Sequence, residues 1–118
     1  RIIKRASKAI RCLPFNYNFY KDAQEKGLSA EGVFIRTAKY KVRESRWFKS
    51  SYSVEATFRW LITIGILRRE VDGQGLTSRI RLTPLGRQML EEKPDLPKQR
   101  AGFKEHLSNW FHSKWSLS

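Results

Sequence analysis

The sequence has one cysteine, two histidines and no long apolar run, and each shortage excludes a class of protein. Because Cys12 has no second cysteine as a partner, the chain can form no internal disulfide and no thiolate zinc site, which suits a reducing cytosol. No apolar stretch approaches the ~18 residues of a membrane span, and no secretory signal pattern is recognisable. We therefore expect a cytoplasmic protein without a membrane partner.

Patterns that would indicate catalysis are equally scarce. His106 and His112 are six positions apart, so they do not share a helix face at metal-ligand spacing. The Gly-Gln-Gly of residues 73–75 falls in an expected hairpin turn and not in a phosphate-binding loop after a strand. The paired acids at 91–92 lie beside an expected linker. We expect no enzymatic activity, no cofactor, no metal and no small-molecule ligand.

Acidic residues are few relative to basic ones. The 24 Lys and Arg residues oppose 11 Asp and Glu residues, which gives a net charge of +13. Nucleic acid is the usual partner of such a domain, since each phosphate that a Lys or Arg neutralises releases condensed counterions. Acidic proteins and acidic membrane surfaces stay open as alternatives. The hydrophobic share of 40%, with 13% aromatic residues, indicates a chain that folds.

The first part of the chain predicts helices. Residues 1–13 contain basic residues without an acid, and their apolar residues recur at three- and four-residue steps, which predicts a basic amphipathic helix that ends at Pro14. Its narrow apolar stripe favours packing on the domain over lying on a membrane surface. A second helix is expected over residues 17–26, with Asn16 as its N-cap and Gly27 as its stop. The face of this helix that we expect to be buried consists of Phe19, Tyr20 and Ala23.

Residues 29–50 are harder to interpret. Ser29 is a candidate N-cap for a third helix, whose apolar stripe would consist of Val33, Phe34, Ala38 and Val42. Residues 37–42 also alternate in the way a strand does, so a strand stays open at this point. Six basic residues oppose Glu44 between positions 36 and 49, and Trp47 and Phe48 lie near the end of this stretch.

The clearest helix is expected to begin at Ser53 and to end at Gly65, which is placed as a C-cap glycine. Its apolar positions repeat at helical spacing and are Val54, Phe58, Leu61 and Ile62. Two short runs at 66–71 and 78–83, joined by a Gly-rich turn at 72–75, then predict a β-hairpin. Because side chains alternate along a strand, Ile80 and Leu82 are expected to face the core, and Arg79 and Arg81 to face the other way.

The chain is expected to continue with a helix, a linker and a last helix. Thr83 as N-cap and Pro84 at the first helical position predict a helix that ends near Leu90. Residues 91–97 indicate a linker. We therefore divide the chain into a domain over residues 1–92 and a C-terminal part over residues 93–118. One apolar face of the last helix, expected to serve packing or dimerisation rather than base stacking, consists of Phe103, Leu107, Trp110, Phe111 and Trp115.

The order of these motifs carries a resemblance. The helix Ser-Val-Glu-Ala-Thr-Phe-Arg of 53–59 is followed by Gly65-Ile66, by Asp-Gly at 72–73 and by Leu-Thr-Pro-Leu-Gly at 82–86. The stretch 53–90, about a third of the chain, resembles the winged helix-turn-helix superfamily, especially regulators of the MarR and PadR type. In those proteins a recognition helix runs into a Gly-Leu or Gly-Ile pair, a wing follows, and Leu-Thr-x-x-Gly begins the next helix. The chain departs from them at 47–52, where a short helix and turn would precede the recognition helix.

The resemblance implies a fold, a function and partners. The fold would be α+β and mostly helical, a winged helix-turn-helix with a two-stranded β-wing and extra N- and C-terminal helices. The function would be that of a sequence-specific transcriptional regulator, a homodimer that binds double-stranded DNA in the nucleoid. A second class stays open, in which the winged helix is a structural or interaction module of a larger replication, transposition or RNA-bound assembly without its own sequence readout.

The resemblance also suggests three groups of DNA-contacting residues. A recognition helix in the major groove would contact base edges with residues near its N-terminus, namely Ser51, Tyr52, Ser53, Glu55, Ala56, Thr57 and Arg59. A wing on the backbone or in the minor groove would use Arg68, Arg69, Gln74, Ser78, Arg79 and Arg81. Further phosphate contacts are expected from Lys4, Arg5, Lys8, Arg11, Arg46 and Lys49. The alternative for every group is a charged or polar face that only contacts water.

Overall fold

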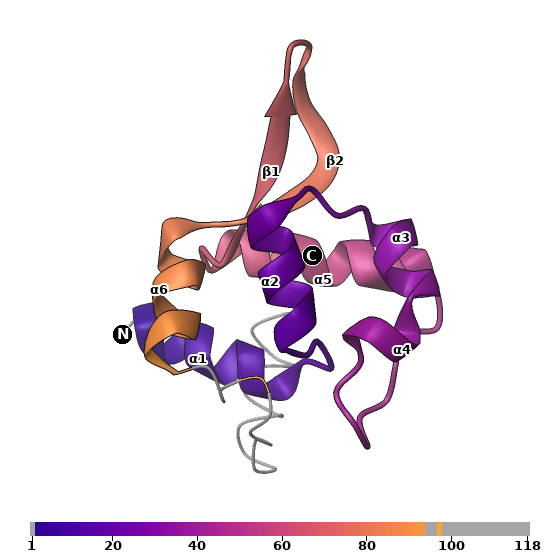
Figure 1. The fold of residues 1–118 in the computed structure, drawn as a ribbon, viewed down its shortest axis with the longest axis vertical. Coiled ribbons are helices and arrows are strands. Elements are labelled where there is room, and N and C mark those ends of the chain that lie inside the picture. Colours follow the sequence, from indigo (N-terminus) through magenta and orange to yellow (C-terminus); the bar gives the residue numbers. More distant parts are fainter. Residues whose placement is uncertain (1, 94–96, 98–118) are drawn as a thin grey trace.

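The computed structural model describes residues 2–93 and Pro97, which form an α+β fold of helices and one two-stranded antiparallel sheet (Figure 1). In chain order the elements are α1 (Ile2–Cys12), α2 (Tyr17–Glu25), α3 (Ala30–Ile35), α4 (Thr37–Tyr40), α5 (Ser51–Thr63), β1 (Leu67–Asp72), β2 (Gly75–Leu82) and α6 (Pro84–Glu92). The α+β class expected from the sequence is confirmed. The predicted C-terminal helix, with its dimer or packing face, lies outside the described residues and stays a prediction.

The helices surround one apolar core, and the β-hairpin of β1 and β2 projects away from them (Figure 1). In α1 the buried residues include Ala6 and Ile10, and in α2 they are Phe19, Tyr20 and Ala23, as the helical spacing predicts. The side chain of Asn16 accepts a hydrogen bond from the Phe19 amide at 3.1 Å, which confirms this N-cap.

The predicted third helix is split in two, because the carbonyl of Phe34 accepts bonds from side chains instead of continuing the helical ladder. The hydroxyl of Thr37 and the indole of Trp47 donate to this carbonyl at 3.2 and 3.0 Å. Arg36 lies at the break between α3 and α4 with φ −104° and ψ 49°. The N-cap prediction at Ser29 is confirmed, since its hydroxyl accepts from the amide of Gly32 at 3.0 Å.

Two expectations for residues 37–42 were wrong. Residues 37–40 are helical, which excludes the strand alternative for them, and Val42 lies beyond the helix end. Instead, the chain extends and pairs with residues 14–16: the amide of Val42 donates to Pro14 O at 2.7 Å, and that of Asn16 donates to Tyr40 O at 2.8 Å. This pairing joins the end of α4 to the turn between α1 and α2.

Helix α5 is the central helix of the fold, and its buried residues include Val54, Phe58 and Leu61. It begins at Ser51, two residues earlier than predicted, because the side chain of Ser50 supplies the N-cap. Gly65 follows its end with φ +90°, a conformation that favours glycine, which confirms the C-cap prediction.

The predicted hairpin is confirmed, although β2 begins at Gly75, three residues before the expected start at 78, and Ile80 and Leu82 face the core as expected. A third extended segment borders it, because Leu28 and Ile80 exchange two backbone hydrogen bonds at 3.1 and 2.8 Å. The pairing of β1 with β2 is irregular between Arg69 and Val71, which is a β-bulge or similar register shift at Glu70.

Helix α6 is joined to the hairpin and to the end of α5 by Thr83. The side chain of Thr83 accepts from the amide of Gly86 and its backbone amide donates to Ile66 O at 2.9 Å, so the predicted N-cap and the first-turn Pro84 are confirmed. The helix extends to Glu92, so the prediction that the linker begins at residue 91 was wrong by two residues. In Figure 1, α6 lies beside α1, away from α3 and α4.

We expect the contact between α2 and α4 to make stability depend on alkaline pH. The hydroxyl of Tyr40 donates to the Asp22 carboxylate at 2.8 Å. Burial, together with this bond, raises the pKa of Tyr40 to about 12, from an ordinary value of 10.0. As the pH rises, the unfolded chain therefore loses this proton before the folded chain does. The stabilisation is complete below pH 10 and is lost as the pH rises to about 12. The free energy of unfolding should fall by on the order of 2 to 3 kcal/mol over this range.

Urea unfolding at pH 9 and pH 11 measures this effect, with Tyr40→Phe as the control. The wild type should lose roughly 1 kcal/mol more than the variant over this interval, since pH 11 lies one unit above the ordinary tyrosine pKa. Equal losses in both proteins would contradict the assignment. On the acid side, burial raises the pKa of Asp22, but hydrogen bonds from Lys39 and Tyr40 outweigh it and hold that pKa below 3.8.

Candidate nucleic-acid interface

The first turns of α5 contain most of the residues predicted to contact base edges. The hydroxyl of Ser50 accepts from the Ser53 amide at 3.2 Å and lies 3.3 Å from the Ser53 hydroxyl, and the hydroxyl of Thr57 donates to Ser53 O at 3.1 Å. Ser51, Ala56 and Thr57 are half-buried. The hydroxyl groups of Ser53 and Thr57 thus have partners within α5 and its N-cap, and the base contacts predicted for Ser51, Ser53, Ala56 and Thr57 stay predictions.

Tyr52 and Arg59 are the predicted α5 residues that extend furthest into solvent. Tyr52 is 74% exposed, and the Arg59 side chain is 56% exposed. They lie on the same helix as the buried Val54 and Phe58, so α5 has one face in the core and one face in water. A helix that presents a polar face in this way can enter a groove of nucleic acid.

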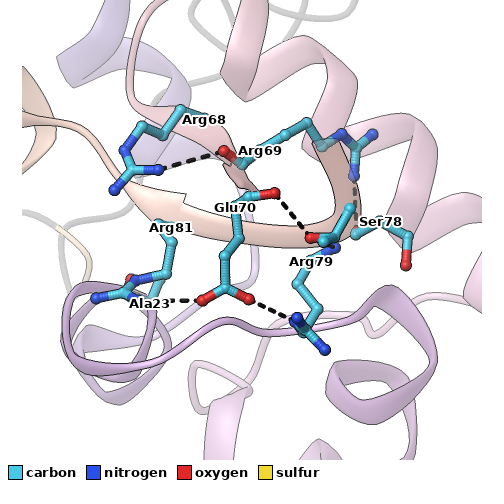
Figure 2. Close-up of polar contacts among 8 residues, drawn as sticks. Ala23, Arg68, Arg69, Glu70, Ser78, Arg79 and Arg81 are labelled. Carbon is cyan, nitrogen blue, oxygen red and sulfur yellow. Dashed lines mark hydrogen bonds and ion pairs between the residues drawn. The ribbon is translucent and has the colours of Figure 1, made fainter. Parts of the chain in front are cut away.

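Glu55 joins α5 to the hairpin. Its carboxylate accepts from Arg59 Nε at 3.2 Å and from both terminal nitrogens of Arg69, one at 3.2 Å and the other in a shorter contact. Arg69 also donates to Ser78 O on β2 at 2.9 Å (Figure 2). We call Glu55, Arg59 and Arg69 the Glu55 cluster. Two guanidinium groups thus share one carboxylate, so the cluster has a net charge of +1.

Arg79 and Arg81 form a second group around Glu70, which we call the Glu70 cluster. The Glu70 carboxylate binds Arg79 Nε at 2.5 Å and Arg81 Nη1 at 3.2 Å, and Figure 2 shows it between the two arginines. The shared face of Arg79 and Arg81 is therefore as predicted. The hydrogen bond from Arg79 lowers the pKa of Glu70 most. Burial raises that pKa, but the further hydrogen bond from Arg81 lowers it again, and the result lies below 4.5.

Arg81 also has a structural role that the sequence did not indicate. Its Nε and Nη2 donate to the carbonyls of Ala23 and Gln24 at 3.2 and 2.9 Å, at the C-terminal end of α2. A cation at this position binds the orphan carbonyls of a helix end. Arg81 therefore anchors the hairpin to α2, and Arg79, 48% exposed, is the member of the pair that is open to an outside anion.

The remaining wing residues lie at opposite ends of the hairpin: Gln74 is in the turn, and Arg68 is near the base, opposite Arg81. Gln74 is exposed, and its amide donates to the Asp72 carboxylate at 2.7 Å in the turn. Arg68 is exposed and its Nη1 donates to the Arg69 carbonyl at 3.2 Å. Val71 and Leu76 face one another in the strand register and are 63% and 76% exposed.

The predicted phosphate contacts outside α5 and the hairpin lie in two places. Arg46 and Lys49 are exposed in the loop that leads into α5, next to its N-terminus. Of the α1 residues, Lys4 and Arg5 are exposed, and Arg5 lies over the ring of Trp60, in the C-terminal half of α5, at 5.8 Å. Lys8 and Arg11 of the same helix are half-buried. Trp60 lies roughly 14 Å along α5 from its first residue, so Arg5 and Lys49 are not expected to contact the same phosphate.

Sequence reasoning missed Lys26, Arg36 and Glu70. The first two lie around a pocket with Arg79, described below. The sequence contains one indirect sign of the position of Glu70, which is the glycine at 27. A Cβ at Gly27 would lie 2.3 Å from a Glu70 carboxylate oxygen, so a larger residue there would require the Glu70 side chain to move. A glycine where two segments approach closely is a recognisable pattern, but the partner segment is not visible in the sequence.

Within residues 2–93 and Pro97, no three His, Cys, Asp or Glu residues are grouped so that they could hold a metal ion. Over the same residues, every helix is too short or too polar to cross a membrane.

The comparisons with known proteins give one match. A family model described as Npun_F0494-like matches residues 1–113. No curated protein matches the chain, and no solved structure matches it.

Proposed function

The chain belongs to the Npun_F0494-like family, and we propose that it is a winged helix-turn-helix protein that binds double-stranded DNA. The element order supports this fold. Helix α3 precedes α5, the hairpin of β1 and β2 follows α5 directly, and Leu28 adds a short extended segment at the edge of β2. In this proposal α5 is the recognition helix and the hairpin is the wing.

The observation that supports the function most is the Glu55 cluster. It ties the exposed face of α5 to the hairpin through Arg69, so a groove-entering helix and a projecting ribbon are held as one surface. Tyr52 and Arg59 are exposed on that surface, and Arg46 and Lys49 lie in the loop before it. Basic side chains next to a helix with an exposed polar face suit phosphate contacts on both sides of a major groove.

The mechanism follows from this geometry. The N-terminal part of α5 enters the major groove, where Arg59 pairs with guanine or phosphate, while the hairpin lies along the adjacent backbone. Arg68 and Arg79 are the exposed cations of the hairpin, and Arg81 holds the hairpin in place. We propose that the protein acts in this way as a sequence-specific regulator of transcription.

Binding to three nucleic acids at matched salt tests this function. Fluorescence anisotropy with a 20-bp random duplex, a single strand of the same sequence and a structured RNA should show preference for the duplex. If ~6 phosphates are neutralised, log affinity should fall with log salt at a slope near −5. A flat salt dependence, or equal affinity for all three, would contradict duplex binding.

A second candidate function is supported by the hairpin tip. The exposed pair Val71 and Leu76 is apolar, and duplex phosphates give apolar side chains no favourable contact. An apolar tip suits a contact with protein, as in a module of a larger nucleoprotein assembly. Loss of duplex preference in the anisotropy experiment would favour this candidate over the first.

A further inference from the structure

A pocket of about 220 Å³ lies between the end of α2, the start of α3 and strand β2. Its lining includes the cations Lys26 after α2, Arg36 between α3 and α4, and Arg79 on β2. Among the described residues that line it there is no Asp or Glu. The Glu70 carboxylate beside Gly27 binds Arg79, but it also binds Arg81, so it leaves the group around the pocket with a surplus of positive charge.

The two arginine side chains at this pocket are held in place without using all of their donors. Arg36 donates Nη1 to Gly32 O at 2.9 Å, and Arg79 donates Nε to Glu70 at 2.5 Å. Each guanidinium has further N–H groups, since arginine has five such donors in a fixed plane. Lys26 and Arg36 are exposed, and Tyr40 closes the floor of the pocket at 1% exposure.

We propose that this pocket binds a phosphate group. Its volume lies below the ~300 Å³ at which sites for drug-sized ligands begin, so it suits a small anionic group rather than a large organic molecule. Charge-assisted hydrogen bonds from arginine favour phosphate, because the planar guanidinium can donate two parallel bonds to it. The glycine backbone at Gly27 leaves room for the Glu70 carboxylate beside the pocket, which orients Arg79 toward it.

The phosphate has two possible sources, which experiment distinguishes. It is either a backbone phosphate of the duplex, in which case the inference rests on the proposed function, or a free phosphate-bearing molecule. Because Arg79 belongs to the hairpin, the first source would extend the DNA-binding surface from the hairpin to the end of α2.

Two measurements on the full chain test the proposal. The first is an NMR titration with inorganic phosphate, using chloride at equal ionic strength as the reference. Phosphate should shift the backbone amides of Gly27, Ser29 and Gly32 in a saturable way, and Arg36→Gln should abolish this. The matched control is Arg87→Gln, which removes the same charge from an exposed position on α6.

The second measurement is the salt dependence of duplex binding by the same variants. If the pocket holds a backbone phosphate, Arg36→Gln and Lys26→Gln should each reduce the salt slope by about 1, and Arg87→Gln should leave it unchanged. Saturable phosphate shifts without a change in slope support the proposal and assign the site to a free phosphate group.

The absence of both effects would overturn the proposal. If inorganic phosphate shifts the pocket amides no more than chloride, and the pocket variants keep the salt slope of Arg87→Gln, the pocket binds no phosphate. If the wild type still binds duplex in that case, the proposed function stands and only the pocket proposal is wrong. If the wild type binds no duplex at all, the proposed function is wrong, and the NMR titration alone tests the pocket.

Discussion

Replacement of Gly86 by alanine should lower the free energy of unfolding by about 1 to 3 kcal/mol. A Cβ at this position would lie 2.7 Å from the carbonyl oxygen of Ile66 and 2.7 Å from a methyl carbon of Leu82. The oxygen cannot easily move, because the amide of Thr83 donates to it at 2.9 Å and the hydroxyl of Thr83, which lies nearer to Gly65 O, is only 3.0 Å away. The new methyl group therefore has to displace a fixed backbone group.

The direction of this effect separates packing from helix propensity. Alanine is favoured over glycine by about 1 kcal/mol inside a helix, so propensity alone would make Gly86→Ala stabilising. A net loss in urea unfolding, followed by circular dichroism, identifies the contact with Ile66 as the cause. Gly73→Ala is the matched control, because its Cβ would meet no atom within 4 Å, and it should change stability by less than about 1 kcal/mol. A stable Gly86→Ala protein would contradict this account.

This contact explains part of the motif on which the resemblance rested. In Leu-Thr-Pro-Leu-Gly, Thr83 caps α6 and binds the carbonyls of Gly65 and Ile66, while Gly86 allows the helix to approach the same turn. The motif is thus a joint between the end of α5, the hairpin and α6. Such a joint serves folding, so its presence alone does not indicate DNA binding.

Much of the fold could be predicted because its signals are local. The caps at Asn16, Ser29 and Thr83 and the C-cap glycine at 65 depend on residues within a few positions of one another. The hairpin follows from its alternation and its Gly-rich turn. The break between α3 and α4 has only one local signal, the hydroxyl of Thr37; the second donor to the Phe34 carbonyl is Trp47, 13 positions further on, which the local pattern does not reveal.

The candidate site was predicted less completely, because its residues are selected by long-range contacts. Arg81 looked like a wing cation, but it binds a carbonyl 58 positions away at the end of α2. Glu55 looked like a base-reading carboxylate, but Arg69 reaches it from a strand 14 positions away. The sequence indicated that arginines lie on the hairpin. Only the structure showed that Arg69 binds Glu55 and that Arg79 and Arg81 bind Glu70.

The Glu55 cluster makes the other large prediction. Glu55→Gln keeps the shape of the side chain and removes the charge that Arg59 and Arg69 share. The two guanidinium groups are then available to phosphates, so binding to a random duplex should become tighter and its salt slope steeper by about 1 to 2. Since one added phosphate contact multiplies the affinity by roughly eight at 0.1 M salt, the expected gain is at least that large.

The same substitution should weaken the joint between helix and hairpin. Arg69 is anchored by Glu55 and by Ser78 O, and both its side chain and that of Glu55 are only 21% exposed, so loss of the ion pair should cost stability on the order of 1 kcal/mol. A double-mutant cycle with Arg69→Gln isolates this term, and we expect a coupling free energy of at least about 0.5 kcal/mol.

Glu91→Gln is the matched control, because it removes one negative charge from an exposed position on α6. The general increase in net charge is the same in both variants, so any extra gain in duplex affinity for Glu55→Gln reports on the surface formed by α5 and the hairpin. Equal affinities and equal salt slopes for the two variants would place the Glu55 cluster outside the DNA interface. That result would leave the fold intact and remove the observation that supports duplex binding most, since Arg59 and Arg69 would then bind only Glu55 and no phosphate.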